Sequence, residues 1–482
     1  MLEFIFKDEN FTENYPLVVV VGDDWRADIK RLGYLNESEK GQLADGLEKC
    51  HFNAEKHDIK TLALGQRYLV VACWGKNFNF IDFDGLAAGI YAKASCFRAV
   101  EIIWNKSAER DENTIAAGLA LALEKAAYRF DKYQTQKKAE DFPELETVSF
   151  PLLKKPVEWR EVTALANAVR YARDLGNEPP NILTPEVFAL DIKRLEYLEL
   201  KVELLDWDYI RRNKLGLIEA VARGSVNKTY VAVMQWCGKP KQKEWDLGLV
   251  GKGVTYDSGG ITLKTDSQQI GEKKDMCGAA SVVAAMKAAA LQKLPLNLIA
   301  VLPLVENMPA PNAYKPDDVV TSLSGQTVEI VDTDGEGRLI LADALWLIQE
   351  KYKVKTVVDM ATLTGSTAYI FGGFYAGLLG NDVTLMSQIK EAARQSGEKV
   401  WELPMEEKIG KWLKSEIADM KQLGKKEADS TQAACFLQRY IQKGTCWAHI
   451  DIAGCETDKK GMATGYGVVL LDKLFKTRLM VD

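Results

Sequence analysis

Histidine is scarce in this chain, with three residues in 482: His51, His57 and His449. His51 and His57 are six positions apart, which does not place them on one helical face, and we expect both at the surface. The eight cysteines are scattered without a CxxC pair, so we expect reduced, partly buried thiols. Zinc sites of imidazole and thiolate need several such side chains at short spacing. Oxygen ligands are therefore the main way for this sequence to hold a metal.

Long uninterrupted apolar runs are also missing. The longest apolar region, residues 276–305, is broken by Lys287, Gln292, Lys293 and Pro295, whereas a membrane span needs about 20 apolar residues in succession. The N-terminal "MLEFIFKDENF" has no basic start followed by an apolar run, so it does not resemble a signal peptide. We therefore expect a cytoplasmic protein without a membrane partner.

Positive charge is not in excess. Lys and Arg number 62 against 68 Asp and Glu, which gives a net charge of −6. This balance argues against a broadly basic nucleic-acid surface and leaves only a local basic patch open.

The composition is that of a globular protein, 47% hydrophobic and 27% charged, in a chain too long for one ordinary core. Residues 1–150 mix short β-rich runs such as "PLVVVVG" with helical patterns such as "TIAAGLALALEKAAYRF", which predicts a smaller N-terminal α/β domain. We place the linker at or just beyond the polar residues 131–150. A larger second domain is expected over residues 160–482.

The second half alternates more clearly between strands and helices. "WDLGLVGKG", "LNLIAVLPLVE", "QTVEIVDTDGEG" and "KTVVDMATLTG" are predicted strands, and "AASVVAAMKAAALQK" and "LILADALWLIQEKY" are predicted helices. Strands this continuously apolar are typical of a mostly parallel central sheet flanked by helices. Ligands of such sheets bind beyond the carboxyl ends of the strands, where the charged turns of this chain fall.

Each charged turn has an ordinary explanation when taken alone. "VGKGVTYDSGGITLK" fails the phosphate-binding loop pattern because glycine follows Lys252, so it reads as a solvated loop. Asp275 precedes a predicted helix and fits a helix cap. "DTDGEGRL" places Asp332, Asp334 and Glu336 at positions 1, 3 and 5 of a calcium loop, with Asp343 at position 12. The β-like segment before this loop and the missing Glu at position 12 count against calcium.

Taken together, the turns predict a metal centre. Asp257, Asp275, Asp334 and Glu336 are four carboxylates at predicted strand ends, and they would not all stay ionised in a cleft without cations. Two divalent ions about 3.5–4 Å apart would neutralise them and form a co-catalytic pair. Mn or Mg suits oxygen ligands, and Zn also accepts carboxylates.

The same stretches carry a family resemblance. "VGKGVTYDSGG", "KKDMCGAA", "VENMPAPNAYKPDDVVTSLSGQTVEIVDTDGEGRL" and "WAHIDIAG" strongly resemble the leucyl, or cytosol, aminopeptidases, and the likeness runs from about residue 165 to the C-terminus. It implies that residues 160–482 form a catalytic metallopeptidase domain that removes N-terminal residues from peptides by means of a metal-bridging water. It also implies a homohexamer, in which residues 1–150 have an oligomerisation or regulatory role.

The resemblance implies a role for each matching residue. The catalytic positions are Lys264, which as an ammonium would stabilise the oxyanion, and Arg338, which would hold a bicarbonate ion as general base. Two metal ions (Mn or Zn, with Mg also open) would be held by Lys252, Asp257, Asp275, Asp334 and Glu336. In this scheme Lys252 would ligate as a neutral amine.

This sequence departs from the family pattern in three places. Asp332 and Gly335 stand where the family usually has Asn and Ala, and "LGKKEADSTQAACF" replaces a glycine-rich loop. The third departure is in the expected substrate pocket, where glutamates stand at two positions commonly held by Met. If both face the pocket, we expect N-terminal Arg or Lys to be accepted better than usual; if the loops shift, both glutamates face solvent. The pocket residues implied are Glu272, Thr362, Gly365, Ala453 and Glu456.

One alternative belongs to another functional class. Some members of the family also bind DNA, so a DNA-binding or architectural protein on the aminopeptidase scaffold is the competing hypothesis. The acidic net charge argues against nucleic acid as the primary partner, and peptides are the expected substrates.

Overall fold

The computed structural model of the chain describes residues 1–7, 15–54, 58–65, 67–74, 83–105, 111–156 and 159–479. The chain divides into two compact units, Met1–Ala166 and Asn167–Asp482, and each is described by itself. His51 is exposed, as expected, whereas the prediction for His57 lies outside the described residues. No described helix has the length and apolar character needed to cross a membrane.

The N-terminal unit is built on a six-stranded sheet in the order β1-β6-β5-β2-β4-β3, parallel except for β3. Strand β2 is buried along its whole length, because side chains on both faces enter apolar cores. The polar residues 131–150 end in a strand of this sheet, β6, so the division between the units lies beyond them, within helix α5 (Trp159–Asn177). The other elements of this unit are β1 (Glu3–Phe6), β2 (Leu17–Val21), α1 (Trp25–Arg31), α2 (Glu37–Lys49), β3 (Ile59–Leu64), β4 (Arg67–Cys73), α3 (Phe83–Ala94), β5 (Ala99–Trp104), α4 (Glu112–Ala126) and β6 (Thr147–Phe150).

The second unit is built on a nine-stranded sheet in the order β16-β15-β18-β14-β9-β11-β8-β7, with β10 pairing β11. The central strands β18, β14, β9 and β11 are parallel, and the antiparallel pairings lie toward the edges. The expected mostly parallel central sheet is therefore confirmed. Its strands are β7 (Lys201–Leu205), β8 (Tyr230–Cys237), β9 (Leu247–Gly251), β10 (Gly253–Asp257), β11 (Asn297–Asn307), β14 (Thr356–Ala361), β15 (Ala376–Gly380), β16 (Val400–Glu402) and β18 (Cys446–Asp451).

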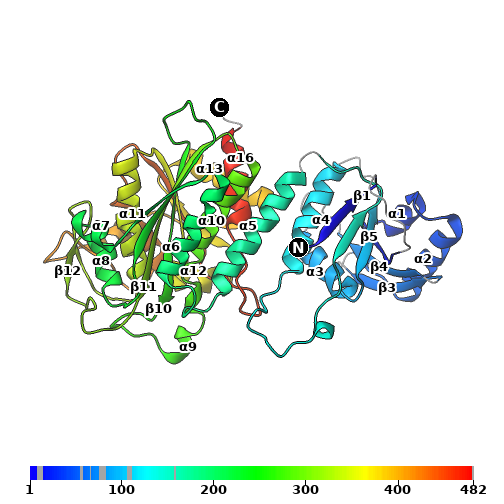
Figure 1. Cartoon of the computed structure of the whole chain (residues 1–482), viewed down its shortest axis with the longest axis horizontal. Helices are drawn as coiled ribbons and strands as arrows, with labels where there is room; N and C mark the ends of the chain where they lie inside the picture. The colour runs from blue at the N-terminus through cyan, green and yellow to red at the C-terminus, as the bar shows by residue number, and fades with distance from the viewer. Residues whose placement is uncertain are drawn as a thin grey trace. The chain divides into compact units, whose positions relative to one another are not determined.

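Both faces of this sheet are covered by helices (Figure 1). Along β11, Leu298, Ala300 and Leu302 enter one core while Ile299 and Val301 enter the other, which explains the unbroken apolar run. Helices α6, α10, α13 and α16 share the first core, and α8, α11 and α15 share the second. The helices of this unit are α6 (Pro185–Arg194), α7 (Trp207–Arg212), α8 (Gly216–Ala222), α9 (Asp266–Gln269), α10 (Cys277–Gln292), α11 (Glu336–Tyr352), α12 (Gly365–Phe371), α13 (Val383–Ser396), α14 (Glu407–Gly410), α15 (Asp429–Gln438) and α16 (Val468–Leu479).

The chain enters this sheet at the edge strand β7, and the direction in which strands are added changes near the middle of the sheet. Strand β9 lies between β11 on one side and β14 on the other, so the order of strands reverses at β9. In open α/β sheets the crevice at such a reversal is the usual place for a ligand.

One strand prediction was placed in the wrong sheet. "QTVEIV" contributes only β13 (Thr327–Glu329), which pairs with β12 (Val319–Thr321) and β17 (Met420–Lys421) in a separate three-stranded sheet. The acids that follow β13 reach the central sheet through the turn before α11. Helix α11 starts at Glu336, so no calcium loop forms, and Asp343 faces away to accept hydrogen bonds from the backbone N–H of Leu217 and Leu323.

Candidate metal centre

Two lysines and the acids around them meet at the carboxyl ends of β9, β10 and β14. Lys252 directly follows β9, and Asp257 is the last residue of β10. Glu336 opens helix α11, where Gly337 lets the chain approach Lys252: a Cβ on Gly337 would lie 2.7 Å from Lys252 Nζ. Gly337, the second glycine of "DGEGRL", is therefore required by the close packing of two segments of the site.

Lys252 is buried and surrounded by oxygen atoms. Its Nζ lies 2.7 Å from Asp275 Oδ1 and 2.8 Å from Glu336 Oε1, and it donates a hydrogen bond to the carbonyl oxygen of Thr362 (2.9 Å). Burial alone would lower the pKa of Lys252, but the Asp275, Glu336 and Asp257 carboxylates raise it well above its ordinary value. With these neighbours alone the group is an ammonium.

Lys264 borders the opposite side of the cluster. Its Nζ donates to Asp257 Oδ2 (2.5 Å) and to Asp334, and it lies 3.9 Å from Glu272 Oε2. Burial would lower the pKa of Lys264, and the carboxylates of Asp257, Glu336 and Asp334 raise it well above its ordinary value.

The carboxylates form two overlapping groups. Asp257, Glu272 and Asp275 each offer an oxygen within 4.8 Å of the others, and so do Asp257, Asp334 and Glu336. Asp257 belongs to both groups, and its Oδ1 is fixed by hydrogen bonds from the Gly259 N–H (2.9 Å) and Asn307 Nδ2 (2.8 Å). The structure thus brings the four predicted acids together and adds a fifth, Glu272.

This concentration of acids changes their protonation. Burial and the Asp257 charge raise the pKa of Asp334 to about 7, although Lys264 opposes the shift. Burial likewise raises the pKa of Glu272 to about 7, and it holds the pKa of Asp275 well above its ordinary range. The acids therefore take up protons near neutral pH unless further positive charge enters the cluster.

The donor set fits divalent cations. Asp275 Oδ2 is buried, and no described residue hydrogen-bonds to it. Asp275 does not cap α10 either, because that helix has no side-chain cap. A buried carboxylate oxygen without a donor beside four other acids suits oxygen-preferring ions such as Mn²⁺ or Mg²⁺, and Zn²⁺ also accepts carboxylates.

Arg338 is the third residue of α11, within its first turn, and is 3% exposed. Its Nη1 donates to the carbonyl oxygen of Gln422 (3.0 Å), and its Nη2 donates to Asp429 Oδ1 (2.7 Å). The Nε–H is buried without a hydrogen-bond partner among the described residues. The guanidinium is thus positioned for an anion, and a carboxylate of the chain already contacts it.

Comparisons with known proteins show the family of the chain. A profile of the "Cytosol aminopeptidase family, catalytic domain" matches residues 170–471. The "Probable cytosol aminopeptidase" of Rickettsia africae is 37% identical, with 99% of each chain covered, and that of Caulobacter vibrioides is 41% identical over 80% of each chain. The chain belongs to the cytosol aminopeptidase family. It is a metalloaminopeptidase, and the family expected from the sequence is confirmed.

Solved structures of similar proteins share the whole fold of this aminopeptidase. A mutant of tomato leucine aminopeptidase has a TM-score of 0.86 at 27% identity, covering 98% of this chain and 96% of that one. Bottromycin maturation enzyme BotP in complex with Mn has a TM-score of 0.83 at 28% identity, covering 98% of this chain and 100% of that one. The likeness extends over both units of the chain.

Most of the expected pocket residues of the aminopeptidase lie at the ends of two adjacent strands. Thr362 and Gly365 follow β14 and Ala453 follows β18, and Asp451 Oδ1 accepts hydrogen bonds from the backbone of both loops. Thr362 also donates from Oγ1 to Asp275 Oδ1 (2.8 Å), so the pocket residues border the carboxylate cluster.

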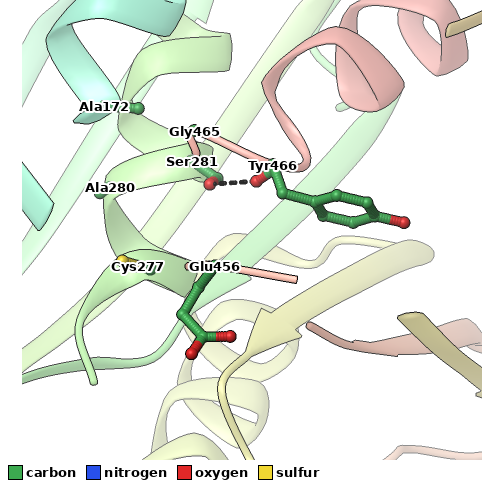
Figure 2. A pocket seen from close by; sticks show the side chains of 7 residues that line it. All are labelled: Ala172, Cys277, Ala280, Ser281, Glu456, Gly465 and Tyr466. Carbon is green, nitrogen blue, oxygen red and sulfur yellow. Dashed lines mark hydrogen bonds between the residues drawn. The ribbon is translucent and has the colours of Figure 1, made fainter. Parts of the chain in front are cut away.

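Glu456 lies elsewhere. It lines a small pocket with Cys277 and Ser281 at the start of α10, and Figure 2 shows its carboxyl group directed away from the hydrogen bond between Ser281 and Tyr466. Burial raises the pKa of Glu456, and its Oε2 has no partner among the described residues. Glu272, by contrast, belongs to the carboxylate cluster, so the two glutamates have different surroundings.

Sequence reasoning missed the residues that position the ligands. Asn307 Nδ2 donates to both Asp257 and the carbonyl oxygen of Thr333 (2.9 Å), and the Tyr314 hydroxyl donates to the same carbonyl (2.7 Å). Asn307 closes a buried strand and Tyr314 follows in the next loop, so their place at a strand end was the available signal.

Proposed function

We propose that this metalloaminopeptidase hydrolyses the N-terminal residue from peptides at a centre of two divalent ions. The support is the pair of overlapping carboxylate groups that share Asp257, since two ligand groups with one bridging acid suit two adjacent cations. When bound, the ions would polarise the scissile carbonyl and lower the pKa of a water molecule.

The family resemblance gives the ligand roles, and in it Glu336 serves both ions together with Asp257. Lys252, Asp257, Asp275 and Glu336 would hold the tighter ion, and Asp257, Asp334 and Glu336 the more exchangeable one. The contacts of Lys252 with Asp275 and Glu336 support its membership of the first set. As a ligand Lys252 must lose its proton, and nearby dications would depress its pKa by the same electrostatics through which the acids now raise it.

Lys264 and Arg338 would serve the reaction without holding an ion. The Lys264 ammonium borders Asp257 and Asp334, so it would stabilise the negative charge that develops on the carbonyl oxygen of a substrate bound there. Arg338 would hold the anion that acts as general base, which the family resemblance gives as bicarbonate. A planar guanidinium suits a planar, bidentate oxyanion.

We propose that this enzyme accepts a cationic side chain at the N-terminus of its substrate better than typical relatives do. Glu272 would supply the negative charge for this preference, because it lies in the same carboxylate group as Asp275, which contacts Thr362. The contribution of Glu456 depends on whether its carboxyl group turns from the α10 pocket toward the substrate.

The test is hydrolysis of a panel of N-terminal aminoacyl amides by the purified chain with Mn²⁺, Zn²⁺, Mg²⁺ or a chelator. We expect turnover with at least one ion and none with chelator, and Mn²⁺ is the first candidate because BotP was solved with Mn. Full activity in a verified metal-free preparation would contradict the proposal.

Two wider features also belong to this proposal. A homohexamer is the assembly that the resemblance favours, with the N-terminal unit contributing to oligomerisation or regulation, and light scattering should give six times the chain mass. A cytoplasmic location is supported by the relatives named cytosol aminopeptidases, and cell fractionation tests it.

A further inference from the structure

The guanidinium of Arg338 already has an anionic partner within the chain. Asp429 Oδ1 accepts from Nη2 at 2.7 Å, and it is the carboxylate within ion-pair distance of Arg338 among the described residues. The Arg338 side chain is 3% exposed and that of Asp429 is 26% exposed. A buried guanidinium is costly without a counter-anion, so this position requires one from the chain or from solution.

Asp429 is held in this position from both sides. The next residue, Ser430, is buried and hydrogen-bonded to Thr364 (2.7 Å) in the loop that follows β14 and to Thr367 (2.8 Å) in α12. Gln432 is fully buried and accepts from the N–H groups of Gly424 and Lys425, which fixes the loop that leads into α15. The pairing is therefore part of a braced structure rather than a contact between two mobile side chains.

The surrounding sequence departs from the usual family pattern. Asp429 lies within "LGKKEADSTQAACF", the segment that replaces the glycine-rich loop usual in the family. A glycine-rich loop offers no carboxylate, so an arginine facing it has to take its anion from solution. Here the substituted segment supplies the carboxylate, and it reaches the same guanidinium.

We propose that Asp429 is the anion held by Arg338, in place of the free bicarbonate of the proposed function. Asp429 takes this role only if the chain hydrolyses peptides as proposed above. Its Oδ1 is engaged by Arg338, whereas no described residue hydrogen-bonds to Oδ2. Oδ2 is therefore the oxygen that remains available to accept a proton.

The proton balance is that of a general base. As the oxygen of the attacking water bonds to the scissile carbonyl carbon, Oδ2 accepts one of its protons, and the carbonyl π electrons move to oxygen. When the carbonyl re-forms and the C–N bond breaks, the same proton passes to the departing amine nitrogen. The carboxylate is regenerated, so no co-reactant is consumed.

The test compares the unaltered full chain, Asp429→Ala and Asp429→Asn, each loaded with the ion that gives the highest activity. Ala leaves space at Arg338, whereas Asn keeps the acceptor oxygen and fills the space without a charge. Rates are measured in CO₂-free buffer with sodium bicarbonate or with sodium chloride at equal ionic strength. The melting temperature in the same solutions gives a readout that does not depend on turnover.

We expect bicarbonate to change neither the rate nor the melting temperature of the unaltered chain. Asp429→Ala should lose ~10²-fold or more in kcat, the usual contribution of a general base, and bicarbonate but not chloride should restore activity and raise its melting temperature. Asp429→Asn should hydrolyse the amide slowly, and bicarbonate should not restore its rate. If bicarbonate restores the activity of Asp429→Ala but not that of Asp429→Asn, the defect is loss of the anion at Arg338 and not a general loss of structure.

Two results would overturn the proposal: an unaltered chain that responds to bicarbonate as strongly as Asp429→Ala, or a variant with full activity in CO₂-free buffer. If Asp429→Ala does not fold, the rate of folded Asp429→Asn in CO₂-free buffer tests the proposal instead. A slow rate supports the proposal, and full activity overturns it. If the unaltered chain hydrolyses no amide with any ion, the proposed function fails. The melting response to bicarbonate still shows in that case which anion occupies Arg338.

Discussion

Replacing Asp257 by Asn tests whether one acid serves two ions. Asp257 belongs to both carboxylate groups, whereas Asp275 and Asp334 each belong to one. Asn can still accept at Oδ1 from Gly259 and Asn307, so the fold of the loop should survive. We therefore expect Asp257→Asn to bind no ion tightly, and Asp275→Asn and Asp334→Asn to retain about one ion per chain.

The magnitude follows from mass action. An ion that binds only the folded chain, at a free concentration 100 times its Kd, adds about 2.7 kcal/mol to the free energy of unfolding. Two sites filled in this way add about 5 kcal/mol to the unaltered chain. The free energy of unfolding of Asp275→Asn and of Asp334→Asn should increase by about half of this amount, and that of Asp257→Asn should barely change.

The assay is metal content per chain by mass spectrometry after gel filtration, together with denaturant unfolding with and without the ion. Asp332→Asn is the matched control, because Asp332 lies in the same turn as Asp334 but in neither carboxylate group. The control should keep both ions. If Asp257→Asn retained two ions, or if the control lost as many as Asp257→Asn, the shared-ligand assignment would be refuted.

Three further predictions test other parts of the structure. Lys264→Ala should lower kcat by ~10²–10³-fold while the chain keeps its ions, and loss of metal instead of rate would reverse the assignment. Glu272→Met should lower the kcat/KM for Arg-amide relative to that for Leu-amide more than Glu456→Met does, because of these two glutamates only Glu272 lies at the carboxylate cluster. If this ratio were unchanged in both variants, neither glutamate would determine the substrate preference. Burial lowers the pKa of His449, but the Asp359 carboxylate 2.5 Å away outweighs burial and raises that pKa above its ordinary value. The pair therefore stabilises the fold below about pH 6.5, the ordinary pKa of histidine. This contribution is lost as the pH rises through the pKa of His449 in the folded chain. The free energy of unfolding should therefore differ most between the unaltered chain and Asp359→Asn at low pH, and a difference that grows with pH would contradict this sign.

Local patterns were enough to predict the elements that carry the site. The apolar runs of β9, β11 and β14 and the helix-forming composition of α10 and α11 are properties of short segments, so they can be read without tertiary information. The rule that the carboxyl ends of parallel strands meet at one edge of a sheet holds for Asp257, whereas Asp334 and Glu336 follow β13 of the separate sheet and reach the cluster through the turn before α11.

The rest depends on contacts between distant segments. Asp429 is 91 residues from Arg338, and its role becomes visible only when α15 packs against α11. Glu272 was assigned to the substrate pocket by counting back from Asp275, but the short helical turn Glu272–Lys274 also brings its carboxylate to the acid cluster. Strand β13 has the composition of a sheet strand, and composition does not tell which of two sheets it joins.

The charges of the site give a reason for an internal anion at Arg338. Five carboxylates against the two ammonium groups of Lys252 and Lys264 leave the cluster three charges negative, and the Arg338–Asp429 pair adds none. Two divalent ions, with Lys252 neutral as their ligand, would take this total to zero, or to one positive charge if Asp429 were absent. A site with the larger positive charge draws an anion from solution, and its activity then depends on the supply of that anion. With Asp429 in place that attraction is weaker and Arg338 is already paired, so the bicarbonate response of the unaltered chain is the measurement that most directly separates this member of the family from relatives with a glycine-rich loop.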